Sequence, residues 1–115
     1  MTVTIYHNPR CSKSRATLAL LEDRGIEPDI VRYLDTPPDA ATLKQLVAML
    51  GISPRELLRR GEQEYRDLGL ASAELDDDAI IAAMASHPRL IERPIVTHDG
   101  KAAIGRPPES VLDIL

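Results

Sequence analysis

Residues 2–34 read TVTIYHNPRCSKSRATLALLEDRGIEPDIVRYL, and their pattern of apolar residues predicts the first three elements of the fold. Residues 2–6 are rich in β-branched side chains, which predicts a short strand. From Ser12 onward the apolar side chains follow helical spacing, and Gly25 is a suitable residue to end that helix. Residues 29–34 predict a second strand. A strand, a helix of about 12 residues and a strand form a βαβ unit, so we expect the two strands to be parallel.

The middle of the chain predicts helices and no strand. Apolar side chains over residues 43–50 recur at i, i+3, i+4 and i+7, which is one face of a helix. Ser53 precedes a proline and a glutamate at the spacing of a helix start, and this predicts a short helix over residues 54–60. Residues 62–70 predict a further helical turn. Asp76 is a suitable N-cap for the last helix of this region.

The C-terminal part predicts a β-hairpin and a closing helix. Residues 94–98 and 101–104 flank Asp99-Gly100, which favours a two-residue hairpin turn. Residues 107–115 predict a short helix. The order is therefore βαβ, helical insert, β-hairpin and C-terminal helix, an α/β plan of the thioredoxin-like type with a mixed β-sheet of about four strands. A length of 115 residues fits one domain over residues 1–115.

Composition limits the classes of function. The net charge is −4 and the pI is near 5.3, which argues against a surface that binds nucleic acid or anionic membranes. The chain has one cysteine and cannot form an internal disulfide, which favours a reducing, cytoplasmic location. The N-terminal residues lack the apolar segment of a signal peptide, and no run of 18 apolar residues predicts a membrane span.

The single cysteine, Cys11, lies where the first predicted strand meets the first predicted helix. Free N–H groups and the positive end of a helix dipole favour a thiolate over a thiol. One helix end stabilises a thiolate by about 0.3–1 kcal/mol. Ionising most of an ordinary thiol at pH 7 requires about 2.7 kcal/mol, so the helix end alone is too weak. Neighbouring donors or cations must therefore help, or else Cys11 is a small core residue without chemistry. The polar residues close to it in sequence are His7, Arg10, Lys13, Ser14 and Arg15.

Two of these neighbours predict specific roles. His7 precedes Cys11 by four residues and is either a cation or hydrogen-bond donor beside the sulfur, or simply a polar residue at a strand end. Ser14 completes a C-x-x-S pattern, and its hydroxyl can donate to the sulfur but cannot resolve a mixed disulfide. A thiol from another molecule must then release an oxidised Cys11.

His87 and His98 lack zinc-ligand spacing to Cys11, so we expect no metal site.

Arginine side chains predict an oxyanion as the substrate, because the planar guanidinium donates two parallel hydrogen bonds to such groups. Arg93-Pro94 and Arg106-Pro107 both lie at ends of the predicted hairpin strands, although each arginine alone could be a surface residue. The chain has no G-x-x-x-x-G-K-[ST] phosphate loop. A C-x5-R loop is also absent because residue 17 is threonine. An oxyanion site must then be assembled from distant parts of the chain.

Five segments of the chain match the motifs of a known family. The matching segments are residues 6–15 (YHNPRCSKSR), 33–38 (YLDTPP), 51–59 (GISPRELLR), 92–96 (ERPIV) and 105–109 (GRPPE). On these motifs the chain resembles the glutaredoxin-coupled arsenate reductases, a branch of the thioredoxin-like superfamily, from Ile5 to Leu115. Better-known members carry a C-terminal extension beyond this point, and we expect catalysis without it because no matched site residue lies there.

The resemblance implies a set of roles. Cys11 is the nucleophile that forms a thiol–arsenate adduct, and His7 supports its thiolate. Pro94 corresponds to the cis-proline that faces the cysteine in this superfamily. Arg59, Arg93 and Arg106 correspond to the family's three oxyanion-binding arginines, and further substrate-contacting positions are Ser14, Arg15 and Asn8. The resemblance also implies glutathione as co-substrate, glutaredoxin as partner, no bound cofactor and a monomer that serves arsenic detoxification.

Two alternatives stay open. A glutathione-dependent thiol reductase acting on another substrate would keep Cys11 but would not need three arginines. The chain also resembles short redox regulators that bind RNA polymerase, although Ser14 excludes the C-x-x-C disulfide switch that some of them use.

Overall fold

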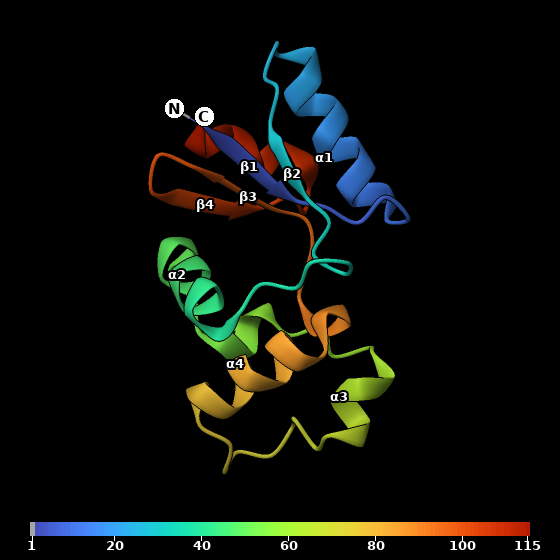
Figure 1. Ribbon diagram of the computed structural model, residues 1–115, viewed down its shortest axis with the longest axis vertical. Coiled ribbons are helices and arrows are strands. Elements are labelled where there is room, and N and C mark those ends of the chain that lie inside the picture. The colour runs from blue at the N-terminus through green and yellow to red at the C-terminus, as the bar shows by residue number, and fades with distance from the viewer. Residues whose placement is uncertain (1) are drawn as a thin grey trace. The chain divides into compact units, whose positions relative to one another are not determined.

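The computed structural model describes residues 2–115, and Met1, the first residue of the predicted domain, lies outside this range. The chain forms two compact units (Figure 1). The first runs through Thr36 and resumes over Arg93–Leu115, and the second is Pro37–Glu92. The expectation of one domain over residues 1–115 stays a prediction.

The first unit contains a four-stranded mixed sheet with strand order β2-β1-β3-β4. β1 pairs with β2 in parallel, and the other two pairings are antiparallel. The predicted α/β, thioredoxin-like class with four strands is confirmed. The elements of this unit are β1 (Val3–Tyr6), α1 (Ser12–Asp23), β2 (Asp29–Val31), β3 (Ile95–His98), β4 (Lys101–Ile104) and the 3₁₀ helix η3 (Pro108–Ile114).

The register of this sheet determines what its two ends carry. Tyr6 pairs with Val31 on one side and with Ile95 on the other, and Ile95 pairs with Ile104. These four residues therefore form one row across the sheet. The segments that leave the sheet just past this row are residues 7–11, 32–35, 93–94 and 105–107, so the loop to Cys11 and both Arg-Pro pairs share one end of the sheet.

An aliphatic core holds α1 and η3 against one face of the sheet. Val3 and Ile5 alternate on β1 and point into this core, where they meet Leu21 of α1, Val96 of β3 and Val111 of η3. The chain contains neither Phe nor Trp, so branched aliphatic side chains fill the space. Each such side chain contributes about 1.5–3 kcal/mol when fully buried.

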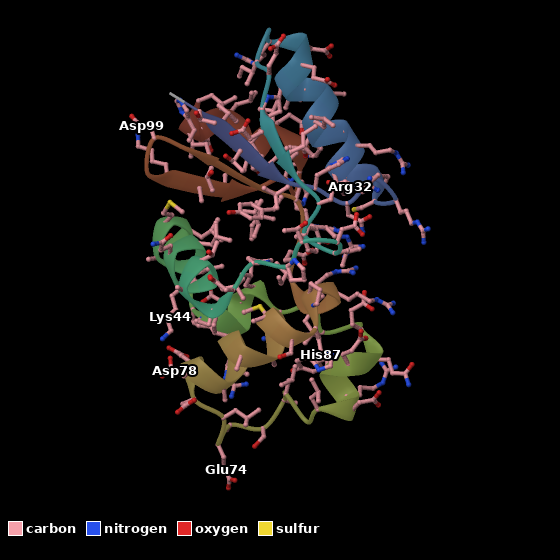
Figure 2. The ribbon with its side chains drawn as sticks, viewed as in Figure 1. Arg32, Lys44, Glu74, Asp78, His87 and Asp99 are labelled. Carbon is pink, nitrogen blue, oxygen red and sulfur yellow. The ribbon has the colours of Figure 1, made fainter. Side chains whose placement is uncertain are left out.

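The predicted hairpin turn is confirmed. Asp99 and Gly100 have φ values of 53° and 77°, which are the left-handed values that a type I′ turn requires at both central residues. Asp99 lies at the tip of the hairpin between β3 and β4 (Figure 2).

The second unit is helical. Its elements are α2 (Ala40–Leu50), η1 (Pro54–Leu57), α3 (Gln63–Asp67), α4 (Asp77–Ser86) and η2 (Pro88–Leu90). The Asp76 carboxylate accepts from the Ala79 N–H at 2.9 Å, which confirms the predicted N-cap of α4. An exposed ion pair joins Lys44 of α2 to Asp78 of α4 at 3.2 Å (Figure 2).

The largest difference from prediction follows Ser53. Ser53 makes no side-chain cap, and the predicted helix over residues 54–60 is wrong beyond Leu57. Leu58 instead forms a β-bridge with Ile91, and the Arg59 N–H donates to the Leu90 carbonyl at 2.8 Å, so non-local bonds replace the helical ones. Tertiary pairing thus overrides a local start signal.

Other differences are smaller. β2 ends at Val31 and not at residue 34, because the N–H groups of Asp35 and Thr36 turn back to the Arg32 carbonyl, both at 2.9 Å. The closing helix begins at Pro108 and is 3₁₀ in character.

Candidate functional site

Cys11 is the N-cap residue of α1, with extended φ and ψ values of −94° and 124°. Its N–H donates to the Asn8 carbonyl, and its carbonyl accepts the Arg15 N–H, both at 3.0 Å. Its exposed fraction is 8%, so Cys11 is a buried residue. Its side chain makes no capping bond to the free N–H groups of the helix. The cysteine therefore lies at the positive end of a 12-residue helix, as the sequence predicts.

A buried hydrogen bond joins His7 to Ser14. The two atoms are Nδ1 of the imidazole and Oγ of the hydroxyl, at 2.6 Å, and Ser14 is fully buried. The same Oγ accepts the Asn8 N–H at 3.0 Å. Since Oγ accepts from Asn8, its own proton can be donated to Nδ1, which leaves the ring proton on Nε2. The Ser14 hydroxyl thus bonds to the loop before Cys11, whereas the sequence suggested a bond to the sulfur.

His7 is held as a neutral imidazole. Burial lowers the pKa of His7 below its ordinary value of 6.5, and the positive charges of Arg32 and Arg15 lower it further. The neutral form therefore predominates at neutral pH. This environment argues against the cationic role that the sequence allowed for His7 and leaves the two other readings open, a hydrogen-bond donor beside the sulfur and a polar residue at a strand end.

The remaining predicted residues of the loop hold its shape. The Arg15 Nη1 group donates to the Pro9 carbonyl at 2.9 Å, and the Asn8 Oδ1 atom accepts the Arg10 N–H at 3.0 Å. Asn8 therefore ties the loop to Ser14 through its backbone and to Arg10 through its side chain. Arg15 ties the first turn of α1 back to the same loop.

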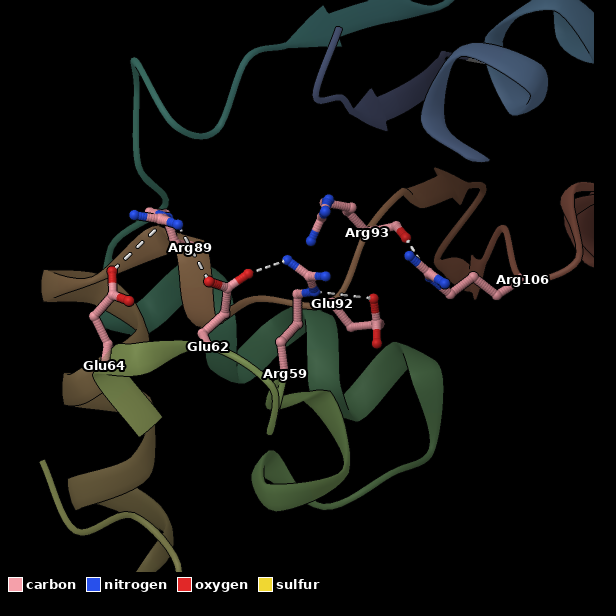
Figure 3. Close-up of polar contacts among 7 residues, drawn as sticks. All are labelled: Arg59, Glu62, Glu64, Arg89, Glu92, Arg93 and Arg106. Atoms are coloured by element: carbon pink, nitrogen blue, oxygen red, sulfur yellow. Dashed lines mark hydrogen bonds and ion pairs between the residues drawn. The ribbon is translucent and has the colours of Figure 1, made fainter. Parts of the chain in front are cut away.

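The two Arg-Pro pairs contact each other at the same end of the sheet. The Arg106 Nε group donates to the Arg93 carbonyl at 3.0 Å (Figure 3). The Gly105 N–H donates to the Pro94 carbonyl at 2.9 Å. The Arg93–Pro94 peptide bond is cis, which confirms what the family resemblance implied, and the Arg106–Pro107 bond is also cis, which was not predicted.

Gly105 brings these pairs against the helix that begins at Cys11. A Cβ atom placed on Gly105 would clash with the Thr17 Oγ1 atom of α1 and would lie 2.8 Å from Pro94 Cγ. Thr17 is buried, and its hydroxyl donates to the Lys13 carbonyl at 2.8 Å. Only glycine allows this close approach. Sequence reasoning missed this contact, and its only signal was a glycine directly before Arg106.

Arg59 belongs to the second unit and lies between two carboxylates. It forms an ion pair with Glu62 and a longer one with Glu92, at 3.7 Å (Figure 3). Glu62 also pairs with Arg89 at 3.3 Å. The side chains of Arg59 and Glu62 are mostly buried, with exposed fractions of 25% and 16%. The sequence predicted Arg59 as an anion ligand but not its acidic partners.

A cavity of about 310 Å³ lies beside the loop that precedes Cys11. Residues 7–10 line one side of it, and Arg32, Leu34 and Asp35 line the other. The His7 N–H donates to the Val31 carbonyl at 2.8 Å and joins the two sides. Sequence reasoning missed Arg32 because it placed this residue inside a predicted strand over residues 29–34, whereas β2 ends at Val31 and leaves Arg32 in the loop at the Cys11 end of the sheet.

Among residues 2–115 no three His, Cys, Asp or Glu side chains are grouped so as to hold a metal ion. Within the same range no helix is both long enough and apolar enough to cross a membrane.

Comparison with known proteins identifies the family. A sequence profile of the ArsC family matches residues 6–114. "Uncharacterized protein YfgD" of Escherichia coli K12 is 58% identical, over 98% of this chain and 96% of that protein. "Arsenate reductase" of Neisseria meningitidis serogroup A is 53% identical, over 98% and 97%. The solved "Arsenate reductase from Vibrio cholerae" is 55% identical with a TM-score of 0.98, over 100% of this chain and 98% of that one. The chain therefore belongs to the ArsC family and has its thioredoxin-like fold.

Proposed function

We propose that this protein reduces arsenate to arsenite, with Cys11 as the nucleophile and with glutathione and glutaredoxin as the external reductants. The cytoplasm, where such thiols are kept reduced, is the proposed location. The observation that carries the proposal is the common end of the sheet, where the Cys11 loop and both Arg-Pro pairs emerge. Relatives named arsenate reductase that match almost the whole chain support the substrate.

The first step is covalent. The Cys11 thiolate attacks arsenic, a sulfur–arsenic bond forms, and one arsenate oxygen leaves as water after protonation. Arg93 and Arg106 would stabilise the anion through charge-assisted hydrogen bonds of about 1.5–3 kcal/mol each. Arg59 enters the proposal through the family resemblance, together with Ser14, Arg15 and Asn8. In this structure the last three order the loop before the nucleophile.

The second step uses two electrons from two thiols. A glutathione thiolate attacks the Cys11 sulfur, the sulfur–arsenic bond breaks, and its electron pair stays on arsenic, which leaves as arsenite. Cys11 is then a mixed disulfide with glutathione. Ser14 carries no thiol, so the chain cannot resolve this disulfide, and a glutaredoxin thiol returns Cys11 to the thiolate.

The proposal is tested by measuring arsenite formed from arsenate with glutathione, glutaredoxin and its reducing system. We expect turnover by the wild-type protein and none above the enzyme-free control by Cys11→Ser. Arg93→Gln and Arg106→Gln should each lower kcat/KM for arsenate by about tenfold or more, because each removes a charge-assisted bond. Equal turnover by Cys11→Ser would refute the nucleophile.

One observation favours a second candidate, a glutathione-dependent thiol reductase of another substrate. Glu62 and Glu92 both contact the Arg59 guanidinium and offset the charge that an oxyanion would need. A thiol reductase needs no such charge. This candidate predicts that exchange of Cys11 with disulfides is fast, that arsenate is not reduced, and that Arg59→Gln leaves the exchange rate unchanged.

A further inference from the structure

The cavity beside the Cys11 loop has the size of a small-molecule site. Its volume is about 310 Å³, close to the lower end of the usual range of about 300–1,000 Å³ for ligand pockets. Residues 8–10 of its wall lead directly into Cys11, so a molecule bound here lies next to the segment that carries the nucleophile. The Arg-Pro pairs are not part of its lining.

The charges in the cavity wall are two cations and one anion. Arg10 and Arg32 supply the guanidinium groups, and Asp35 supplies a carboxylate that lies 3.4 Å from the Arg32 Nε atom. Leu34 adds an apolar wall with an exposed fraction of 38%. The site is therefore net positive in a chain whose net charge is −4. The pKa of His7, which also lines the cavity, is lowered in part by Arg32, in agreement with a positive potential there.

We propose that this cavity binds the carboxylates of the thiol co-substrate, a peptide thiol with two carboxylates and one ammonium group, through Arg10 and Arg32. The proposal rests on the proposed use of glutathione. Two guanidinium groups match the two carboxylates, and Asp35 offers a partner for the ammonium. Bound in this way, the peptide is held on the side of Cys11 formed by the loops after β1 and β2, and it does not occupy the Arg-Pro pairs, which are outside the cavity lining.

The test is a reaction that needs no arsenate. Reduced protein is mixed with glutathione disulfide, and the Cys11 thiolate attacks one of its sulfurs, forming a mixed disulfide and releasing one glutathione thiolate. The rate is followed by mass spectrometry. The neutral 2-hydroxyethyl disulfide, which has no carboxylates, reports the intrinsic reactivity of Cys11 in every variant.

We expect Arg10→Gln and Arg32→Gln each to slow the reaction with glutathione disulfide by about threefold, the effect of an exposed ion pair, and the double variant by about tenfold. The rate with 2-hydroxyethyl disulfide should change by less than twofold. The wild-type rate should also saturate with glutathione disulfide. Non-reactive S-methylglutathione should shift the amide NMR signals of Asn8, Arg32 and Asp35.

Arg24→Gln is the matched control, because it removes the same charge from the same unit at the opposite end of α1. If Arg24→Gln slows the reaction with glutathione disulfide as much as Arg32→Gln does, long-range attraction between the protein and the anionic disulfide accounts for the effect, and the site is refuted. Unchanged rates in Arg10→Gln and Arg32→Gln also overturn it. Loss of arsenate reduction with these rate effects intact would defeat the proposed function and leave this site standing.

Discussion

The N–H of Gly105 donates to the carbonyl of Pro94 at 2.9 Å, and this bond joins the two Arg-Pro pairs of the first unit. The same glycine touches Thr17 on the helix that begins at Cys11. One residue without a side chain thus connects the nucleophile's helix to the segments that carry Arg93 and Arg106.

Gly105→Ala should destabilise the protein by about 1–3 kcal/mol, the usual cost of inserting a methylene into a packed site. The new methyl group would displace Thr17 or Pro94, which both lie within the distance that a Cβ occupies. Urea unfolding measures the change. Gly61→Ala is the matched control, because a Cβ there meets no atom within 4 Å, and it should change stability by less than about 0.5 kcal/mol. Equal effects of the two substitutions would show that Gly105 has room.

Ser14→Ala should cost about 1–3 kcal/mol of stability. The hydroxyl is fully buried and serves both His7 Nδ1 and the Asn8 N–H, and its removal leaves buried polar groups unsatisfied. Chemical unfolding measures this loss. Ser12→Ala is the control, since Ser12 is exposed and lies on the same helix. A Ser14→Ala protein as stable as Ser12→Ala would contradict the buried bond.

The protein should lose stability as the pH falls below about 6.5 because of His7. Its pKa in the folded protein is lower than the ordinary value of 6.5, so the unfolded chain binds a proton first as the pH falls. The contribution of neutral His7 to stability is complete above about pH 6.5, the pKa in the unfolded chain, and is lost as the pH falls through the lower pKa of the folded protein. An NMR titration of the His7 ring should give a midpoint below 6.5. A midpoint at or above 6.5 would mean that His7 is not held neutral.

His7→Gln should reduce this loss of stability between pH 7.5 and pH 5.5. Urea unfolding of both proteins at each pH measures the difference. An identical pH dependence in the variant would assign the effect to other groups.

Glu62→Gln should destabilise the second unit by about 1–2 kcal/mol, because a mostly buried charge-assisted hydrogen bond contributes more to stability than an exposed one. Glu62 contacts both Arg59 and Arg89, and its exposed fraction is 16%. Lys44→Gln breaks the exposed pair with Asp78 and should cost less than about 0.5 kcal/mol. Thermal or urea unfolding compares the two, and a larger loss for Lys44→Gln would contradict the ranking.

The parts of the fold that the sequence predicts correctly depend on local patterns. The βαβ unit follows from apolar periodicity, the hairpin from Asp99-Gly100, and the start of α4 from Asp76. In each case the residues that specify the element lie within or directly beside it. The place of Cys11 at the start of α1 is predicted for the same reason.

The parts that the sequence could not predict depend on contacts between distant residues. Leu58 pairs with Ile91, so the helix expected beyond Leu57 does not form. Glu92 contacts Arg59 from 33 positions along the chain, and Gly105 contacts Thr17 from 88 positions away. No local pattern records such pairs. The motifs of the family indicate Arg59, but not the carboxylates that hold it.

If the Cys11 sulfur takes part in arsenate reduction, mass spectrometry under single-turnover conditions should detect the covalent product on this residue. Reduced protein is given arsenate and glutathione without glutaredoxin. We predict about one arsenite per protein and one glutathione attached to Cys11, with turnover restored when glutaredoxin is added. Arsenite formed in excess of the protein while Cys11 stays unmodified would show that Cys11 is not the nucleophile.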